Sequence, residues 1–196
     1  MRETVKREMR LFTGLELAND VAGNLEDLLR RLKPAARIHW SPPENLHVTT
    51  KFIGEWPEAR LGELKAALGD LPGRAAIAVR IRQVGFFPNA HSPRNFWCGI
   101  EAPGLAELAA DIDMATAALG IAREKRDFSP HLTLARMKPN HPGGPVELQA
   151  LHKAIAGLAT LEFGGFAAGS FFLYQSTLRP AGSVYTKLAE FPLTKS

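Results

Sequence analysis

Two copies of the tripeptide His-x-Thr, 84 residues apart, constrain this chain more than any other feature of its sequence. They occupy residues 47–49 and 131–133, each inside a short apolar segment of the kind that forms a strand. Residues i and i+2 of a strand share a face. We therefore expect each histidine to point the same way as its threonine, while the apolar residue between them packs into the interior.

The two motifs occupy equivalent places in an internal duplication. Each half of the chain reads as strand, helix, strand, helix, strand, and each histidine follows the first strand of its half, beginning at Leu11 or Asn95, by 36 residues. Such a repeat indicates two related structural units. The pair Asn19-Asp20 is typical of a helix N-cap. The predicted strands are 11–17, 46–53, 75–84, 95–101, 128–136, 161–174 and 184–191, and the predicted helices are 20–33, 57–71, 104–120 and 145–158.

The repeat predicts two lobes of one compact unit. The candidate boundary is the turn-rich segment 85–94, which we expect to cross from one lobe to the other. With 196 residues and 45% hydrophobic content, the chain is large enough to bury a core as one domain. We therefore predict a single domain over residues 1–196, with lobes of roughly 10–86 and 95–193 between which strands can be exchanged.

The charge balance permits an anionic ligand without demanding one. The chain carries 24 Lys and Arg against 20 Asp and Glu, a net charge of +4, and no polycationic tail. We expect the basic residues Arg80, Arg82 and 123–126 to be solvated surface residues rather than a nucleic-acid groove. Phe12 and Trp40 could stack a base, although packing in the core is the favoured interpretation for both.

The N-terminal residues and the apolar segments predict where in the cell the protein is found. Residues 1–10 carry charges where a signal peptide needs an apolar run, and the most apolar segment, 163–174, is too short to span a bilayer as a helix. Cys98 is the only cysteine, so no intramolecular disulfide can form, and its apolar surroundings favour a buried structural thiol. We expect a soluble, cytoplasmic protein that makes no use of a membrane.

Two histidines and two threonines facing each other suit chemistry at a phosphoryl centre. One imidazole can take a proton from the nucleophile while the other gives one to the leaving oxygen, and hydroxyl groups can donate to the non-bridging oxygens. Arg136, at the end of the second motif's strand, could reach the same phosphate. The alternative is that both histidines are ordinary polar residues on solvated faces of their strands. A metal site is disfavoured because no HExxH, His-x-His or Cys-x-x-Cys occurs, and His39, His91, His141 and His152 lack a partner motif.

The paired motifs resemble those of the two-histidine (2H) phosphoesterase superfamily, in particular the RNA 2′,3′-cyclic phosphodiesterases historically called 2′-5′ RNA ligases (LigT/ThpR-like). The resemblance covers the chain from Arg10 to about Leu193. Its most specific parts are PENLHVTTKFIG at 43–54 and SPHLTLAR at 129–136, and segments 10–12 and 173–176 also look like the family. The departures are small: Val48 and Thr50 stand where Leu is usual, and Thr13-Gly14 where larger or Ala residues are common.

This resemblance implies a fold and an activity. The fold would be α+β and bilobal, with two pseudo-symmetric lobes of antiparallel sheet and outer helices around a central cleft. The activity would be metal-free opening of a 2′,3′-cyclic phosphate to a 2′-phosphomonoester, with RNA carrying such an end, or a cyclic nucleotide, as the partner. His47 would be the proton donor and His131 the proton acceptor; Thr49, Thr133 and Arg136 would bind the phosphate. The resemblance also implies no cofactor, a monomer, and 2′-5′ RNA ligation as a possible second reaction.

Two alternatives stay open on the sequence alone. A non-catalytic module could bind RNA or a nucleotide through the same residues, although intact His and Thr in both motifs argue against it. A 2H enzyme acting on a small cyclic nucleotide or an ADP-ribose-type cyclic phosphate would use identical catalytic residues. The sequence does not identify the RNA, its length or its base preference.

Overall fold

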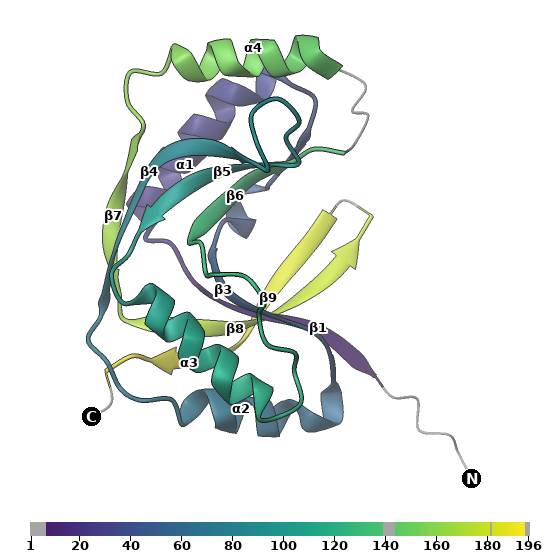
Figure 1. Ribbon diagram of the computed structural model, residues 1–196, viewed down its shortest axis with the longest axis vertical. Helices are drawn as coiled ribbons and strands as arrows, with labels where there is room; N and C mark the ends of the chain where they lie inside the picture. Colours follow the sequence, from purple (N-terminus) through teal and green to yellow (C-terminus); the bar gives the residue numbers. More distant parts are fainter. Residues whose placement is uncertain (1–6, 139–143, 181, 195–196) are drawn as a thin grey trace.

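The structure is a computed structural model that describes residues 7–138, 144–180 and 182–194. These residues form two antiparallel sheets with four α-helices outside them, which confirms the predicted α+β fold (Figure 1). His141, to which the sequence assigns no role, and Ala181, in the turn before the last strand, lie outside the described residues. The strands are β1 (Glu8–Leu15), β2 (His39–Trp40), β3 (Val48–Pro57), β4 (Ile77–Phe87), β5 (Asn95–Glu101), β6 (His131–Arg136), β7 (Glu162–Ala168), β8 (Ser170–Arg179) and β9 (Gly182–Pro192), and the α-helices are α1 (Asn19–Leu32), α2 (Leu61–Gly69), α3 (Leu105–Ala117) and α4 (Gly144–Ala156).

Each half of the chain contributes strands to both sheets. Sheet A has the strand order β3-β1-β8-β9, and sheet B has the order β2-β6-β5-β4-β7. Strands β2 and β4 of the first half therefore lie in sheet B, and β8 and β9 of the second half lie in sheet A. The segment 85–94 does not cross between lobes as the sequence predicts. It belongs to a hairpin inside sheet B, because β4 continues to Phe87 and pairs with β5, with Phe87 opposite Asn95.

Helical spacing of apolar residues is confirmed most clearly in α1. Its leucines at 25, 28, 29 and 32 are all buried, together with Val21. The helix packs against β7 of sheet B, whereas α3 packs against β3 of sheet A and against α2 (Figure 1). The predicted Asn19-Asp20 cap is wrong by one residue: Ala18 is the N-cap residue of α1, and no side chain caps the helix.

The structure has one strand that the sequence pattern does not predict, and it divides one predicted strand into two. The short strand β2 pairs with the end of β6, with His39 opposite Arg136. The apolar run 161–174 is two strands, because the chain passes from sheet B to sheet A at Gly169, whose carbonyl accepts a hydrogen bond from the Leu193 amide. A continuous apolar run in the sequence does not reveal such a change of sheet.

Cys98 lies in the interior of β5 and is fully buried, which confirms the structural interpretation of the lone thiol. Burial raises the pKa of its thiol well above the ordinary value, so the reactive thiolate is disfavoured. In the described part of the chain, none of the helices combines the length and the apolar character that a membrane crossing requires.

Gly85 is needed because a neighbouring ring occupies the space above it. A Cβ atom at Gly85 would lie 2.3 Å from the Trp97 indole, whereas a Cβ atom at Gly23, in α1, would meet nothing within 4 Å. We expect Gly85→Ala to lower the free energy of unfolding by about 1–3 kcal/mol through overpacking. Gly23→Ala should raise it by about 0.5–1 kcal/mol, because alanine favours the helix. Urea unfolding of both variants measures this, and equal stability of the two would contradict the packing described for Gly85.

Candidate active site

A β-bulge in β6 places three candidate side chains on one face. The register of β6 against β5 shifts between Phe96 and Trp97, so one extra residue of β6 is inserted there. Leu134 and Ala135, which are consecutive, are in consequence both fully buried. Beyond them the alternation resumes, and Arg136 is exposed on the face that carries the half-buried His131 and Thr133. Simple alternation from Thr133 would have turned Arg136 to the opposite face.

Strand β3 repeats this bulge beside the first motif. Its register against β1 shifts between Thr13 and Gly14, and the consecutive residues Thr50 and Lys51 are both buried. Phe52, the next residue, is exposed on the face of Thr49. His47 itself lies one residue before β3, not inside a strand as the sequence predicts. The two strands that carry the motifs contact each other.

Each histidine ring is held by an equivalent hydrogen bond to a backbone carbonyl. The Nδ1 atom of His47 lies 2.7 Å from the carbonyl oxygen of Asn45, and that of His131 lies 2.8 Å from the carbonyl oxygen of Ser129. A carbonyl only accepts, so Nδ1–H is the donor in both cases and Nε2 is the nitrogen available for proton transfer. The same local turn, with its acceptor two residues earlier, thus orients both rings.

The His47 Nε2 atom lies 2.9 Å from the Thr49 hydroxyl oxygen. When the ring is neutral the hydroxyl donates to Nε2, and when it is protonated Nε2–H donates to the hydroxyl. The equivalent threonine of the second motif, Thr133, makes no side-chain hydrogen bond to any described residue; its carbonyl oxygen accepts one from the Ser41 hydroxyl. The first motif is therefore internally bonded, and the second leaves its hydroxyl available.

Aromatic rings surround His47. The Phe12 ring lies 4.7 Å from it and the Tyr185 ring packs edge-on at 5.1 Å, while Phe12 stacks on Tyr174 at 5.0 Å. Phe12 is buried, so its predicted role in the core is confirmed. Trp40 likewise packs against the core, and its indole N–H donates to the Ala36 carbonyl. The two tyrosines come from β8 and β9, and no local pattern near His47 could have identified them.

Burial lowers the pKa of His47, and the charge of Arg136 lowers it further, while the hydrogen bond to the Asn45 carbonyl acts in the opposite direction. Arg136, from sheet B, is therefore near enough for its charge to disfavour the imidazolium form of His47. Arg136 has no carboxylate partner in the described ranges. A guanidinium that is not paired with an acid can bind an anion such as a phosphate.

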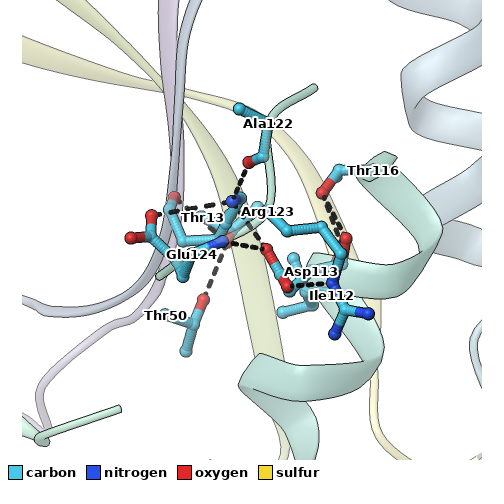
Figure 2. Close-up of polar contacts among 9 residues, drawn as sticks. Thr13, Thr50, Ile112, Asp113, Thr116, Ala122, Arg123 and Glu124 are labelled. Atoms are coloured by element: carbon cyan, nitrogen blue, oxygen red, sulfur yellow. Dashed lines mark hydrogen bonds and ion pairs between the residues drawn. The ribbon is translucent and has the colours of Figure 1, made fainter. Parts of the chain in front are cut away.

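A buried ion pair ties β3 to the segment that leads into β6 (Figure 2). The Lys51 ammonium donates to Asp113 Oδ1 at 2.7 Å and to the Ala122 carbonyl at 2.8 Å. Asp113, on α3, also accepts from Arg123 Nε and from the Glu124 amide. Burial tends to raise the pKa of Asp113, but these donors outweigh it and lower the pKa to about 2. Arg123 is exposed, as expected for a surface residue, and its guanidinium is also bonded to Asp113.

Metal-binding side chains do not gather anywhere in the described ranges: no three of His, Cys, Asp and Glu lie together in a way that could hold an ion. The carboxylates of Asp113 and Glu124 are paired with Lys51. Arg82, another of the basic residues expected on the surface, pairs with Glu101 and Glu162.

A family model described as LigT like Phosphoesterase matches residues 15–97 and 100–185. The chain belongs to this family. Among relatives of this LigT-like phosphoesterase, the RNA 2′,3′-cyclic phosphodiesterase of Methanothermobacter thermautotrophicus is 33% identical over 95% of this chain and 100% of its own length. The protein of the same name from Thermus thermophilus is 33% identical over 94% of this chain and 90% of its own length.

Solved structures of the family have the same fold. A crystal structure of a Thermus thermophilus protein matches this LigT-like phosphoesterase with a TM-score of 0.75 and 32% identity, over 94% of this chain and 98% of that one. The crystal structure of Escherichia coli LigT complexed with 3′-AMP matches with a TM-score of 0.74 over 96% of this chain and 100% of that one. Its identity is 23%, so this second likeness concerns the fold alone.

We expect His47 to titrate below the ordinary histidine pKa of about 6.5, because burial and Arg136 outweigh its bond to Asn45. Replacing Arg136 with Gln removes a positive charge that disfavours the imidazolium, so the midpoint of His47 should move up. NMR titration of the imidazole C–H signals in the free protein measures both shifts. Arg31→Gln, an exposed change on α1, is the control and should leave the midpoint in place. An unchanged midpoint in the Arg136 variant would contradict the proximity of the two groups.

Proposed function

We propose that this LigT-like phosphoesterase hydrolyses RNA 2′,3′-cyclic phosphate ends to 2′-phosphomonoesters, with His47 and His131 as the acid and the base. The observation that carries the proposal is the matched anchoring of the two imidazoles, each with Nδ1 bonded to a carbonyl and Nε2 left for proton transfer. The names of the relatives from Methanothermobacter and Thermus support the substrate. In this proposal the enzyme is a single-domain cytoplasmic monomer that needs no cofactor.

The proposed reaction moves one proton at each histidine. His131 Nε2 takes a proton from water as the water oxygen attacks phosphorus, and the bond from phosphorus to O3′ breaks. His47 Nε2–H gives its proton to the departing O3′, which leaves the phosphate on O2′. A lowered pKa makes the His47 imidazolium a stronger acid toward that oxygen. An RNA 5′-hydroxyl in place of water would give a 2′,5′-phosphodiester, the product of ligation.

The remaining residues of the two motifs stabilise the transition state in this proposal. Thr133, whose hydroxyl has no partner among the described residues, donates to a non-bridging oxygen, and Thr49 does so from its position beside His47 Nε2. Arg136 supplies positive charge to the phosphorane-like centre. The negative charge of the bound phosphate also offsets the lowering of the His47 pKa by Arg136, so His47 is protonated when substrate is present.

Replacing either histidine with alanine should lower kcat/KM by at least about 10²-fold, the usual contribution of one general acid or base. The assay is hydrolysis of an oligonucleotide with a 2′,3′-cyclic phosphate end, with the product isomer identified by NMR or chromatography. The matched control is His91→Ala, which removes an exposed imidazole from the 88–94 loop. Near-normal turnover by the His47 variant would show that this residue is not the acid. Turnover of cyclic mononucleotides but not of the oligonucleotide would favour a small-molecule substrate.

Chelation should leave the activity intact, because the imidazoles and fixed hydroxyl and guanidinium groups do the work that a Lewis acid would otherwise do. The measurement is the initial rate in the same assay after dialysis against EDTA, with and without added Mg²⁺, Mn²⁺ or Zn²⁺. Loss of activity in EDTA that one of these ions restores would refute metal-free catalysis.

A further inference from the structure

The hairpin of β8 and β9 extends beyond sheet A as a two-stranded ribbon (Figure 1). Strand β1 pairs with β8 only as far as Gln175, so residues 176–179 and 182–185, here called the outer ribbon, pair with each other alone. Leu178 and Val184, in the outer ribbon, are 71% and 50% exposed. Two strands without a third neighbour are marginally stable in water. The position of the outer ribbon therefore depends on its contacts with the rest of the protein.

Asn45 holds the outer ribbon by a hydrogen bond from outside the hairpin. Its side-chain Nδ2 donates to the carbonyl oxygen of Ser183 at 2.6 Å. Within the described ranges, no other side chain from outside the hairpin is hydrogen-bonded to the outer ribbon. Asn45 ends the short 3₁₀-helix η2 (Pro43–Asn45), which packs against α1, and its backbone amide donates to the Pro42 carbonyl at 2.9 Å. The amide side chain thus joins the ribbon to a part of the chain that is itself fixed.

Both the backbone and the side chain of Asn45 lead to His47. Its carbonyl oxygen accepts the bond from His47 Nδ1 at 2.7 Å. Ser183, which its side chain binds, is two residues from Tyr185, and the Tyr185 ring packs edge-on against the His47 ring at 5.1 Å. Burial is the largest cause of the lowered pKa of His47, and the Tyr185 ring contributes to that burial. Holding the outer ribbon therefore holds the ring that covers the imidazole.

The second motif lacks this arrangement. Ser129 stands where Asn45 stands in the first motif, two residues before the histidine, and its carbonyl holds His131 in the same way. Its side chain is exposed and makes no hydrogen bond to any described residue. The ring beside His131 is that of Phe87, which lies in β4 and pairs with β5 inside sheet B. The carbonyl bond to the ring thus needs no amide side chain, and the Asn45 amide serves the ribbon.

We propose that Asn45 is a positioning residue for His47: its amide side chain holds the outer ribbon over the first motif while its carbonyl holds the imidazole. The inference rests on the proposed function, because it takes His47 as the proton donor. An amide suits this place because its NH₂ group can donate to the Ser183 carbonyl, whereas a carboxylate of the same shape can only accept. Asn45 contributes no ligand to the phosphate in this arrangement.

The kinetic test compares Asn45→Ala and Asn45→Asp with the unaltered enzyme on the oligonucleotide with a 2′,3′-cyclic phosphate end. Both variants lose the donor to the Ser183 carbonyl, so kcat should fall about 10- to 100-fold, because displacement of a reacting group by about 1 Å can cost that much. KM should stay within about twofold, because the residues proposed to bind the phosphate are unaltered. The isosteric Asn45→Asp variant also keeps the kinetic test valid if Asn45→Ala does not fold, which thermal unfolding shows.

Asn24→Ala is the matched control. The Asn24 side chain on α1 donates from Nδ2 to the Phe163 carbonyl in β7 at 3.1 Å, so this variant loses the same kind of bond far from both motifs. It should keep both kcat and KM. A fall in kcat that Asn24→Ala reproduces would overturn the inference, because general loosening of the fold would then explain it. Unchanged kcat in the Asn45 variants, or a change confined to KM, would overturn it too.

The titration midpoint of His47, measured by NMR in the free protein, separates this inference from the proposed function. In Asn45→Ala the imidazole should gain contact with water, so its midpoint should move up toward the ordinary value of about 6.5. In Asn24→Ala it should stay in place. If the unaltered protein hydrolyses no cyclic phosphate, the proposed function fails, and a raised midpoint in Asn45→Ala alone still supports the positioning of His47. The same midpoint in Asn45→Ala and in the unaltered protein overturns it.

Discussion

The ion pair between Lys51 and Asp113 is the interaction on which the relation between the two motif strands depends. The Lys51 side chain is 1% exposed, and an ammonium group so far from water is tolerated only when its hydrogen bonds are satisfied. Removing one member of such a pair costs about 3–5 kcal/mol, because the other charge is left buried. Lys51 follows Thr49 by two residues, and its second acceptor, Ala122, begins the segment that leads to His131. One ammonium group therefore links the strand of one histidine to the approach of the other.

The bulge in β3 makes this ion pair compatible with the first motif. In the proposed reaction Thr49 faces the phosphate, and strict alternation would turn Lys51 to that same face. The extra residue lets Thr50 and Lys51 both face α3, where Thr50 bonds to the Thr13 hydroxyl. In β6 the equivalent places hold Leu134 and Ala135, which pack into the core without any charge. The same kind of bulge thus buries a polar, charged pair of residues in sheet A and an apolar pair in sheet B.

The sequence predicted those features that depend on neighbouring residues. The four helices, most of the strands and the two His-x-Thr motifs follow from local spacing, and the α+β fold and the family are confirmed. The assignments of His47, His131, Thr49, Thr133 and Arg136 to the reaction stay predictions, although the charge of Arg136 acts on His47.

Features that depend on distant residues were missed. Alternation alone gives no sign of a bulge. A lysine in a strand predicts a solvated face, and the residues around Lys51 do not reveal its acidic partner, which is 62 residues away on a helix. The tyrosines around His47 and the exchange of strands between the two halves depend on pairing between residues that are far apart in the sequence. A turn-rich segment such as 85–94 predicts a reversal of the chain, but it does not say whether the reversal stays within one sheet.

The position of β1 inside sheet A has a consequence for how the protein is made. Its neighbour β8 follows it by more than 160 residues, with Leu11 opposite Gln175. While the ribosome synthesises the intervening chain, β1 can pair only with β3, and its other edge offers free amide and carbonyl groups to any passing strand. Pairing across such a separation is slow compared with hairpin formation. The nascent chain must therefore protect the open edge of β1 until β8 has emerged from the ribosome. Aggregation is most favoured during that interval, when a chaperone bound to the edge would prevent it.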